Sequence, residues 1–302
     1  MFKEGIININ KPSGWTSQDV CAKLRSKLHI KRIGHTGTLD PMATGVLPVC
    51  IGRATRIIEY FDMDLKTYRA TMKLGIKTDT LDITGNVLEE NSTDSINTDN
   101  IKKAITSFEG VIEQIPPKYS AIRVNGKRAY ELAREGKEVE IKPRKIKINS
   151  ISVIDIDLEN MTVSFDVCCS KGTYIRTLCD DIGNKLGCGA TLTKLERLNS
   201  GCFKIEDAYT IDEVVAMTDV ELNNIIISAE KTLTNLGEIL VDNNKIIVYK
   251  NGNEITNDSF HIKKNTSFKN IYKVYSDNEF LGTGRIEENI LKPEKVIIFE
   301  NN

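Results

Sequence analysis

The sequence predicts an α+β fold, in which a mixed, largely antiparallel sheet is flanked by helices and followed by a small β-rich C-terminal domain. Alternating apolar residues mark strands from Lys66 to Leu74 and from Met161 to Cys169. Apolar residues at helical spacing mark helices after Ser17 and after Thr173. Because these elements mix without a regular βαβ rhythm, a mixed sheet is favoured over a doubly wound parallel one.

Capping residues predict where the helices begin and end. Ser17 is expected to cap the first helix, and Thr173 is expected to cap a later helix that ends at Gly187. Thr210 and Glu213 have the spacing of a capping box at the start of another helix. These signals predict helices between the strands of one large domain.

The C-terminal part of the chain differs in composition from the rest. After about residue 240, turns rich in Asn, Asp and Gly separate short strand-like segments such as 245–249 and 295–299. We therefore expect one domain over residues 1–238 and a small separate β domain over residues 239–302.

Length and composition indicate an ordinary globular protein. The chain has 302 residues, of which 40% are hydrophobic, and this is enough for one large core and a smaller domain. It lacks the apolar run of a signal peptide or a membrane span, so we expect a cytoplasmic protein without a membrane partner. Seven cysteines without a C-x-x-C pair and three widely spaced histidines predict free thiols and no metal site.

Charge is strongly segregated along the chain, although the formal net charge is only -1. Residues 22–32 carry five Lys or Arg and no acid, and residues 118–147 carry ten Lys or Arg against four Glu. Residues 206–238 hold eight acids and one base. One such run is usually a solvated helix face, but two basic runs beside candidate site loops favour binding of phosphates.

The glycine-rich loop 34–45 contains the strongest candidate for chemistry, Asp40. An isolated Asp-Pro pair usually starts a turn, and Asp40 precedes Pro41. Here, however, three glycines and three threonines surround the carboxylate, so a ligand could approach the backbone closely. No phosphate-binding glycine motif is present, which disfavours an enzyme that uses nucleoside triphosphates.

Six segments of the chain resemble, in the same order, the motifs of the TruB family of tRNA pseudouridine synthases. They span about residues 5 to 200 and comprise 11–17, 34–45, 66–70, 77–80, 117–121 and 172–177. The resemblance implies a pseudouridine-synthase sheet and an enzyme that isomerises uridine 55 in the T-loop of tRNA. That reaction detaches uracil from its ribose, rotates it and rejoins it through C5, and it requires no cofactor.

The resemblance assigns the nucleophile to Asp40, which attacks either the sugar C1′ or uracil C6. A buried carboxylate tends towards the neutral form, so a nearby cation is needed. Arg176 matches the family arginine that pairs with this aspartate, and its guanidinium can hold the carboxylate through two contacts and lower its pKa. Without the motif, Arg176 would be interpreted as a surface residue of a helix.

Further family positions imply how the base is held. Tyr68 matches the tyrosine that stacks on the target base, and its hydroxyl is the candidate for removing the C5 proton, directly or through water. Tyr174 and Leu195 match positions that line the uracil pocket. Periodicity alone would place Tyr68 on the apolar face of a strand and Leu195 in the core.

The remaining family matches concern the RNA. His35 corresponds to a histidine that lies against the flipped nucleotide, and Lys11 and Arg56 match basic positions where phosphate contacts are expected. Residues 118–147 correspond to an insertion that clasps the T-stem loop. Glu196 departs from the family pattern, in which many relatives carry a basic residue, so a phosphate contact there is in doubt.

Residues 239–302 resemble an RNA-binding PUA domain through segments 272–274 and 280–285. The chain has no lysine-rich tail of the kind found in guide-RNA-dependent relatives, which favours the stand-alone bacterial type, a monomer without guide RNA. Two alternative functions remain at this stage. One is a tRNA-binding folding chaperone, and the other is an N-glycosidase that releases uracil.

Overall fold

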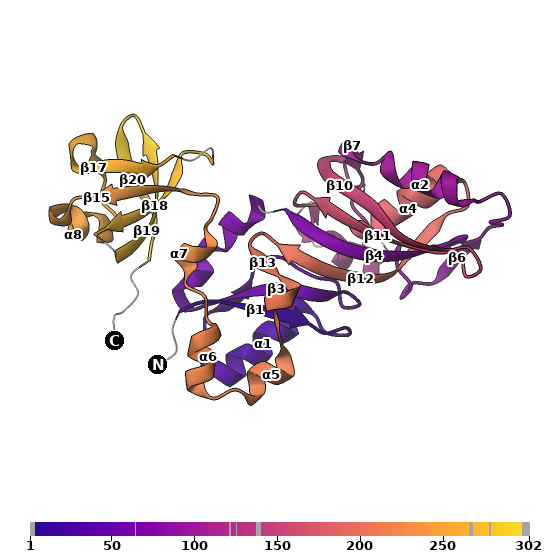
Figure 1. Cartoon of the computed structure of the whole chain (residues 1–302), viewed down its shortest axis with the longest axis horizontal. Coiled ribbons are helices and arrows are strands. Elements are labelled where there is room, and N and C mark those ends of the chain that lie inside the picture. The colour runs from indigo at the N-terminus through magenta and orange to yellow at the C-terminus, as the bar shows by residue number, and fades with distance from the viewer. Residues whose placement is uncertain are drawn as a thin grey trace.

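A computed structural model describes residues 4–63, 65–120, 122–124, 126–136, 140–265, 268–277 and 279–297. One 10-stranded sheet extends through most of the molecule, and a separate 6-stranded sheet follows it at the C-terminal end (Figure 1). Helices lie against the large sheet. The predicted α+β fold class is therefore confirmed.

The large sheet is mixed and largely antiparallel. Its strands are β1 (Gly5–Lys11), β2 (Ile33–His35), β3 (Thr44–Ile51), β4 (Lys66–Leu74), β7 (Gly110–Gln114), β10 (Arg144–Asp157), β11 (Thr162–Cys169), β12 (Ala190–Ser200), β13 (Phe203–Lys204) and β14 (Tyr209–Thr210). Their order is β14-β1-β3-β12-β4-β11-β10-β7, with β2 beside β3 and β13 beside β12. Within the described strands, the β1–β14 and β3–β12 pairs are parallel and the other pairs are antiparallel.

Two halves of this sheet meet at the short β3–β12 pairing, which we call the seam. The seam consists of Thr44 opposite Glu196 and Gly45 opposite Arg197. Gly45 has a φ of +100°, and a Cβ at this position would lie 2.3 Å from the backbone oxygen of Arg197. Glycine is therefore required where the two backbones approach each other, and the loop 36–43 ends directly beside this contact.

Helices cover the two halves of the sheet separately (Figure 1). They are α1 (Ser17–Leu28), the 3-10 helix η1 (Gly52–Met63), α2 (Thr98–Thr106), α4 (Ile175–Leu186), the 3-10 helix η2 (Ile205–Asp207), α5 (Ile211–Ala216), α6 (Asp219–Ile225) and α7 (Ala229–Thr232). Helix α1 contacts β2 and α5, whereas α4 contacts β12 and α2. None of the helices in the described ranges combines the length and the apolar character needed to span a membrane.

Helix α1 begins at Ser17, the residue that was expected to be its N-cap. Thr16 occupies the N-cap of α1 and forms a capping box with Asp19, so the prediction of Ser17 as the cap is wrong. The Ser17 side chain instead accepts a hydrogen bond from the backbone N–H of Leu39 at 2.9 Å. This bond ties α1 to the loop that carries Asp40.

The cap expected at Thr173 is also wrong, because Tyr174 occupies the N-cap of α4 without a capping side-chain bond. The Thr173 hydroxyl donates to the backbone oxygen of Ser170 instead. The end of this helix at Gly187 is confirmed. The capping box at the start of α5, predicted from Thr210 and Glu213, is confirmed too.

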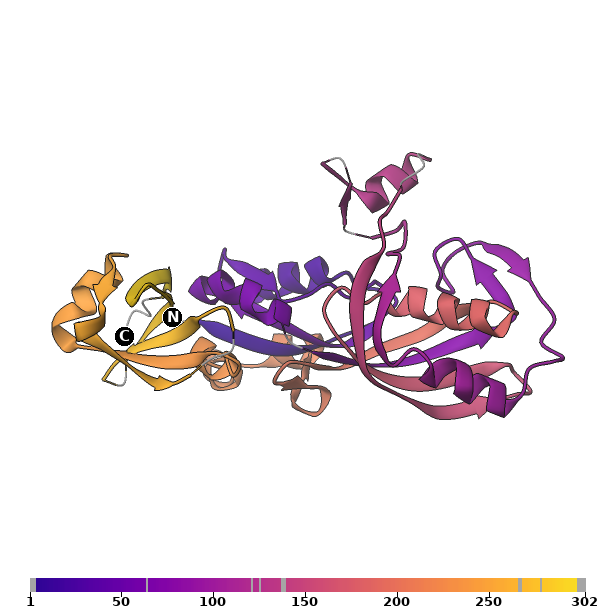
Figure 2. The same cartoon turned by 90° about the horizontal axis from the view of Figure 1, so that it is seen from above.

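A small hairpin unit projects from the large sheet near residues 118–147 (Figure 2). It contains β8 (Arg123–Val124), β9 (Lys127–Arg128) and the short helix α3 (Ala129–Arg134). A second hairpin, β5 (Ile76–Thr78) with β6 (Val87–Glu90), lies beside β12. Residues 121, 125 and 137–139 of the predicted insertion lie outside the described residues.

The C-terminal sheet begins at Gly237. It comprises β15 (Gly237–Val241), β16 (Ile255–Thr256), β17 (Phe260–Lys264), β18 (Ile271–Ser276), β19 (Glu279–Glu287) and β20 (Ile290–Val296), in the order β16-β20-β19-β18-β15-β17. The short helices η3 (Asn243–Lys245), α8 (Ile246–Lys250) and η4 (Asn257–Ser259) complete this part. Residues 245–249 were expected to form a strand, but they are helical.

The difference at residues 245–249 has a packing cause. Tyr249 is fully buried while Ile247 is 73% exposed, so the segment buries one helical face against β19 and β20. Tertiary packing here overrides the strand preference of β-branched residues. The other expected strand in this region ends at Val296 in β20, and residues 298 and 299 lie outside the described range.

Candidate active site

The loop 36–43, between β2 and β3, is held by bonds from several elements. The backbone N–H of Gly14 donates to Pro41 O at 2.8 Å, and the N–H of Ala43 donates to Asp40 O at 3.0 Å. Ser17 of α1 binds Leu39 as described above. The carboxylate of Asp40 therefore projects from a loop with a fixed backbone.

Asp40 and Arg176 form an ion pair beside the seam. Arg176 Nε lies 2.8 Å from Asp40 Oδ2, and Nη2 donates to Oδ1 at 3.4 Å. The Arg176 side chain is 5% exposed, whereas that of Asp40 is 36% exposed. The arginine thus holds the carboxylate from the protein side and leaves part of it accessible to a substrate.

Other groups fix the Arg176 guanidinium from the remaining sides. Its Nη1 donates to Thr80 O and its Nη2 donates to Tyr119 O, both at 3.0 Å. Asp82 Oδ2 lies 3.6 Å from Nη1. Asp82 was not expected at this site, although it follows the segment 77–80 by only two residues.

The pKa of Asp40 is raised from the ordinary aspartate value. Burial is the largest cause, and the nearby negative charge of Asp82 acts in the same direction. The positive charge of Arg176 lowers the pKa, as we expected, but it does not outweigh burial. A carboxylate held ionised against this tendency is a stronger nucleophile than a well-solvated one.

Tyr68 and Leu195 are buried and lie diagonally to each other on the same face of the neighbouring strands β4 and β12. Tyr68 in β4 is opposite Arg197 in β12, and Leu195 is opposite Ala70. Burial raises the pKa of Tyr68, and Asp40 is among the charges that act on it. The two expected substrate-binding residues therefore flank the seam near Asp40.

Tyr174 lies at the N-terminus of α4, two residues before Arg176. Its backbone N–H donates to Gln114 Oε1 at 2.8 Å, and Gln114 Nε2 donates back to its carbonyl at 3.1 Å. Burial raises the pKa of the Tyr174 hydroxyl, whereas a hydrogen bond with Ser120 lowers it. Gln114, which sequence reasoning did not single out, thus fixes one edge of the candidate pocket.

His35 is half-buried at the end of β2, and its two ring nitrogens differ. Nε2 lies 3.1 Å from Gln18 Nε2, while the buried Nδ1 has no hydrogen-bond partner among the described residues. Burial lowers the pKa of this imidazole, and the positive charge of Arg197 adds to the effect. The lowered pKa favours the neutral form of the His35 ring.

Lys11 was expected to contact a phosphate, but it lies inside the protein. Its side chain is fully buried, and Nζ donates to Pro12 O, Trp15 O and Pro41 O at 2.8, 2.6 and 3.2 Å. Burial lowers its pKa to about 8, although Asp40 opposes this change. The ammonium thus binds the backbone around the Asp40 loop.

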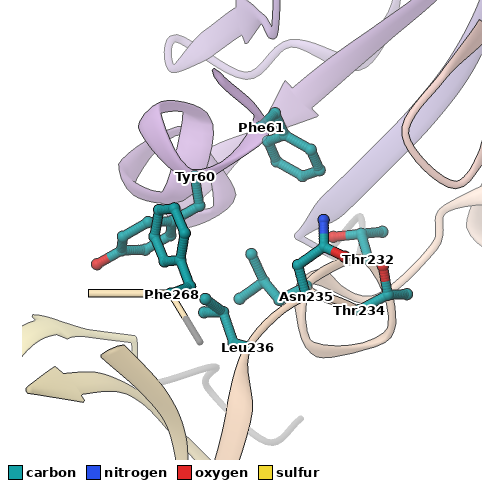
Figure 3. Close-up of a pocket in the computed structure, with 8 residues that line it drawn as sticks. Tyr60, Phe61, Thr232, Thr234, Asn235, Leu236 and Phe268 are labelled. Atoms are coloured by element: carbon teal, nitrogen blue, oxygen red, sulfur yellow. The ribbon is translucent and has the colours of Figure 1, made fainter. Parts of the chain in front are cut away.

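Arg56 lies away from Asp40, at the junction with the C-terminal sheet. It is exposed on η1, and its Nη1 donates to Val296 O at 2.5 Å. Beside this junction, Tyr60, Phe61, Leu236 and Phe268 line a small pocket (Figure 3). Its volume of about 10 Å³ suffices for about one water molecule, and it contains none of the charged groups around Asp40.

Arg197 is the third residue of the site, after Asp82 and Gln114, that the sequence did not lead us to expect. It is 1% exposed, and its Nε and Nη2 donate to Val46 O and Gly37 O at 2.6 and 3.2 Å. Glu196, its neighbour, faces the exposed Arg69 across β4 instead of the candidate pocket. An arginine in the alternating pattern of a buried strand is the signal that could have identified Arg197.

No cluster of three or more His, Cys, Asp or Glu side chains in the described ranges could hold a metal ion. All seven cysteines are free thiols, and five of them are buried. The chemistry that this arrangement offers is therefore that of a carboxylate, a phenol and buried cations. These groups suit nucleophilic attack and proton transfer.

Two family models match consecutive parts of the chain. Residues 25–175 match the TruB family pseudouridylate synthase N-terminal domain, and residues 176–234 match the tRNA pseudouridylate synthase B C-terminal domain. The first match includes Asp40 and Tyr68, and the second begins at Arg176.

Relatives and solved structures agree with these matches. The tRNA pseudouridine synthase B of Clostridium perfringens strain 13 is 47% identical over 98% of this chain and 99% of its own length. That of Clostridium kluyveri is 46% identical over 98% and 100%. The crystal structure of a Cbf5-Nop10-Gar1 complex is similar with a TM-score of 0.75 and 27% identity, over 97% of this chain and 84% of that one. The chain therefore belongs to the TruB family and is a tRNA pseudouridine synthase.

Proposed function

We propose that this tRNA pseudouridine synthase converts uridine 55 in the T-loop of tRNA to pseudouridine, with Asp40 as the nucleophile. The observation that carries the proposal is the Asp40–Arg176 pair at the seam, with Arg176 on the buried side and Asp40 partly accessible. Such a carboxylate can be kept ionised without water and can still reach a ribose or a base. Tyr68, Tyr174 and Leu195 form the proposed uracil pocket.

Substrate and product are isomers, so no co-substrate is consumed. In the C1′ route, a carboxylate oxygen of Asp40 bonds to C1′ as the C1′–N1 bond breaks, and C5 then displaces the carboxylate. In the alternative route, the same oxygen adds to uracil C6, the C1′–N1 bond breaks and C5 bonds to C1′, and the C6–O bond then breaks to return the free carboxylate. In both routes C5 loses a proton and the released ring nitrogen gains one, and Tyr68 is the proposed base for C5.

The same residues favour rejoining over release of uracil. An N-glycosidase must deliver water to C1′, whereas here Arg176 and Tyr68 are buried beside the carboxylate. Exclusion of water from the detached base protects the intermediate until C5 has attacked. A role as folding chaperone alone would not require the pairing of a partly accessible Asp40 with a buried Arg176.

We propose that the projecting hairpin unit and its base bind the T-stem loop. Arg123 and Lys127 are exposed on the hairpin, and further exposed cations follow where its chain returns to β10. These are Lys142, Arg144, Lys145 and Lys147. A row of exposed cations positions a phosphate backbone, while His35 occupies the space left by the flipped uridine.

We also propose that residues 1–238 form the catalytic domain and residues 239–302 form a PUA-like RNA-binding domain. The observation behind this division is that strand pairing changes to the second sheet at Gly237. The enzyme would act as a monomer in the cytoplasm, without guide RNA, and bind tRNA directly through these two parts.

Replacement of the nucleophile tests the proposal. Asp40→Asn keeps the size of the side chain but removes the attacking charge, so pseudouridine formation should be abolished while tRNA affinity stays nearly intact. The measurement is release of tritium from C5 of labelled uridine in tRNA, together with filter binding. Normal turnover by the variant would refute the assignment, and a uridine 55→cytidine tRNA serves as the substrate control.

The salt dependence of tRNA binding tests the proposed hairpin contact. Affinity should fall steeply as salt rises, because cations on the protein release counterions from phosphates. Arg123→Ala combined with Lys127→Ala should reduce the slope of log affinity against log salt by about 1 to 2. A slope unchanged from that of the unaltered chain would remove the hairpin from the interface.

A further inference from the structure

Arg197 occupies an unusual position between the two halves of the large sheet. In register it lies opposite Tyr68 of β4 on one side and opposite Gly45 of β3 on the other. Its side chain is among the largest fully buried ones in the described chain. A full positive charge is therefore enclosed at the seam, next to the proposed catalytic tyrosine.

Two edges of this guanidinium are satisfied by backbone. Nε donates to Val46 O and Nη2 donates to Gly37 O, which lies in the same loop as Asp40. The third group, Nη1, is buried and has no hydrogen-bond partner among the described residues. A Cβ built on Gly37 would lie 3.7 Å from Nη1, which places that nitrogen directly under the loop.

The charge of Arg197 is not neutralised by an acid. Within the described ranges no carboxylate forms an ion pair with it, in contrast to Arg176 with Asp40 and Asp82. Burial of an unpaired cation with an unused donor is unfavourable for stability. A buried cation of this kind can stabilise a negative charge that forms during the reaction.

Tyr68 is the group whose negative charge Arg197 can stabilise. Burial raises the pKa of the Tyr68 hydroxyl, and the positive charge of Arg197 is the largest influence in the opposite direction. The guanidinium also acts in this direction as a donor near the phenol, although the two groups do not form a hydrogen bond in this structure. The side chains at 68 and 197 lie on the same face of neighbouring strands and directly opposite each other, so the unused Nη1 is a donor available on the side of the phenol.

We propose that Arg197 is a positioning residue that acts through Tyr68, by donating from Nη1 to the phenolic oxygen when that oxygen becomes negatively charged. The proposal rests on the function proposed above, in which Tyr68 removes the C5 proton. Tyr68 first gives its phenol proton to the ring nitrogen released from C1′, which leaves a phenolate. The C5–H bond then breaks, its electron pair returns to the pyrimidine ring, and the phenolate takes the proton. The protons thus balance, and Arg197 keeps its own.

The experiment replaces the guanidinium and then compensates for its loss. Arg197→Met should lower the single-turnover rate of pseudouridine formation by about 100-fold, the range of proton-transfer catalysis, with tRNA affinity unchanged. Site-specific 3-fluorotyrosine at position 68, whose phenol is more acidic, should restore a large part of that rate. Arg69→Met is the matched control, because Arg69 lies next to Tyr68 in sequence but is exposed and paired with Asp166.

Each outcome decides the proposal. A normal rate for Arg197→Met, or a loss that 3-fluorotyrosine does not relieve, would show that Arg197 only supports the backbone. If Arg197→Met fails to fold, ¹⁹F NMR titration of 3-fluorotyrosine 68 in the chain with Arg197 intact and in Arg197→Lys provides the answer. A higher phenol pKa in Arg197→Lys supports the proposal, and the same pKa in both chains overturns it.

The activities of the unaltered chain and of Asp40→Asn distinguish a failure of the proposed function from a failure of the role proposed for Arg197. If the unaltered chain releases C5 tritium and Asp40→Asn does not, the function stands whatever Arg197→Met shows. If the unaltered chain forms no pseudouridine, the proposed function itself fails.

Discussion

The two buried arginines of the site, Arg176 and Arg197, have opposite surroundings. Arg176 is 5% exposed and lies between the carboxylates of Asp40 and Asp82. Arg197 is 1% exposed and binds only backbone carbonyls among the described residues. The positive charge of Arg176 is thus offset by two carboxylates. The positive charge of Arg197 is not offset by a carboxylate among the described residues.

The difference separates the two tasks that the chemistry sets. The carboxylate cluster keeps one anion ionised before the substrate arrives, because Arg176 opposes the effect of burial on the pKa of Asp40. Arg197 and Lys11, by contrast, bind backbone carbonyls, and under the proposed mechanism Arg197 stabilises negative charge that forms later on Tyr68. Their mutual repulsion contributes to the lowered pKa of Lys11.

Arg176→Lys should break the carboxylate cluster with the largest effect. A lysine keeps the charge but cannot contact both oxygens of Asp40 while donating to Thr80 O and Tyr119 O. Loss of about 3 kcal/mol of charged hydrogen bonding lowers the single-turnover rate about 100-fold. Tritium release measures the rate, and tRNA affinity should not change. Wild-type kinetics would contradict the proposed pair.

The buried cation Lys11, which binds backbone carbonyls as Arg197 does, should make the stability of the protein depend on pH. Burial lowers its pKa to about 8, so between pH 8 and 10.5 the unfolded chain holds the extra proton. The unfolding free energy should therefore rise with pH relative to that of Lys11→Met, by up to about 3 kcal/mol. Below pH 8 both states are protonated, and the full cost of the buried charge is present.

Urea unfolding of both proteins at a series of pH values measures this difference. Other titrating groups occur in both chains and cancel in the comparison. Lys23→Met, which removes an exposed lysine from α1, controls for the loss of one positive charge. A difference that stays constant from pH 7 to 10.5 would show that Lys11 is not buried as a cation.

Local sequence signals predicted the strands around the site well. The alternation from Lys66 to Leu74 gives β4 with its buried face, and the Thr210–Glu213 capping box forms as expected. These signals succeed because their causes lie within a few residues of one another. The N-cap of α1 at Thr16 instead of Ser17 shows the usual limit at element boundaries.

Contacts between distant segments could not be predicted in the same way. Arg197 affects the pKa of Tyr68, and Asp82 forms an ion pair with Arg176. Each partner is far away in sequence, so no local pattern marks Arg197 or Asp82 as a site residue. Lys11 was expected at a phosphate because it is a lysine in a motif. Its burial depends on how the loops 12–15 and 36–43 close over it, which only the folded chain reveals.

Asp82→Asn tests the outer part of the carboxylate cluster and should have the smallest effect. Asp82 Oδ1 accepts from Thr80 Oγ1 at 2.9 Å and from the backbone N–H of Thr84 at 3.0 Å, and asparagine can keep both bonds. The charge near Arg176 is lost, so we expect about a tenfold lower rate, or roughly 1.4 kcal/mol. The negative charge of Asp82 raises the pKa of Asp40, so its removal should lower that pKa.

The pH–rate profile distinguishes this electrostatic effect from a general disturbance of the loop. Because the proposed attack requires ionised Asp40, the acid limb of the profile for Asp82→Asn should move to lower pH. Asp79→Asn is the matched control, since Asp79 lies in the same loop but binds Asn86. A slower enzyme whose acid limb stays in place would mean that Asp82 only supports the loop. The carboxylate cluster would then be reduced to Asp40 and Arg176.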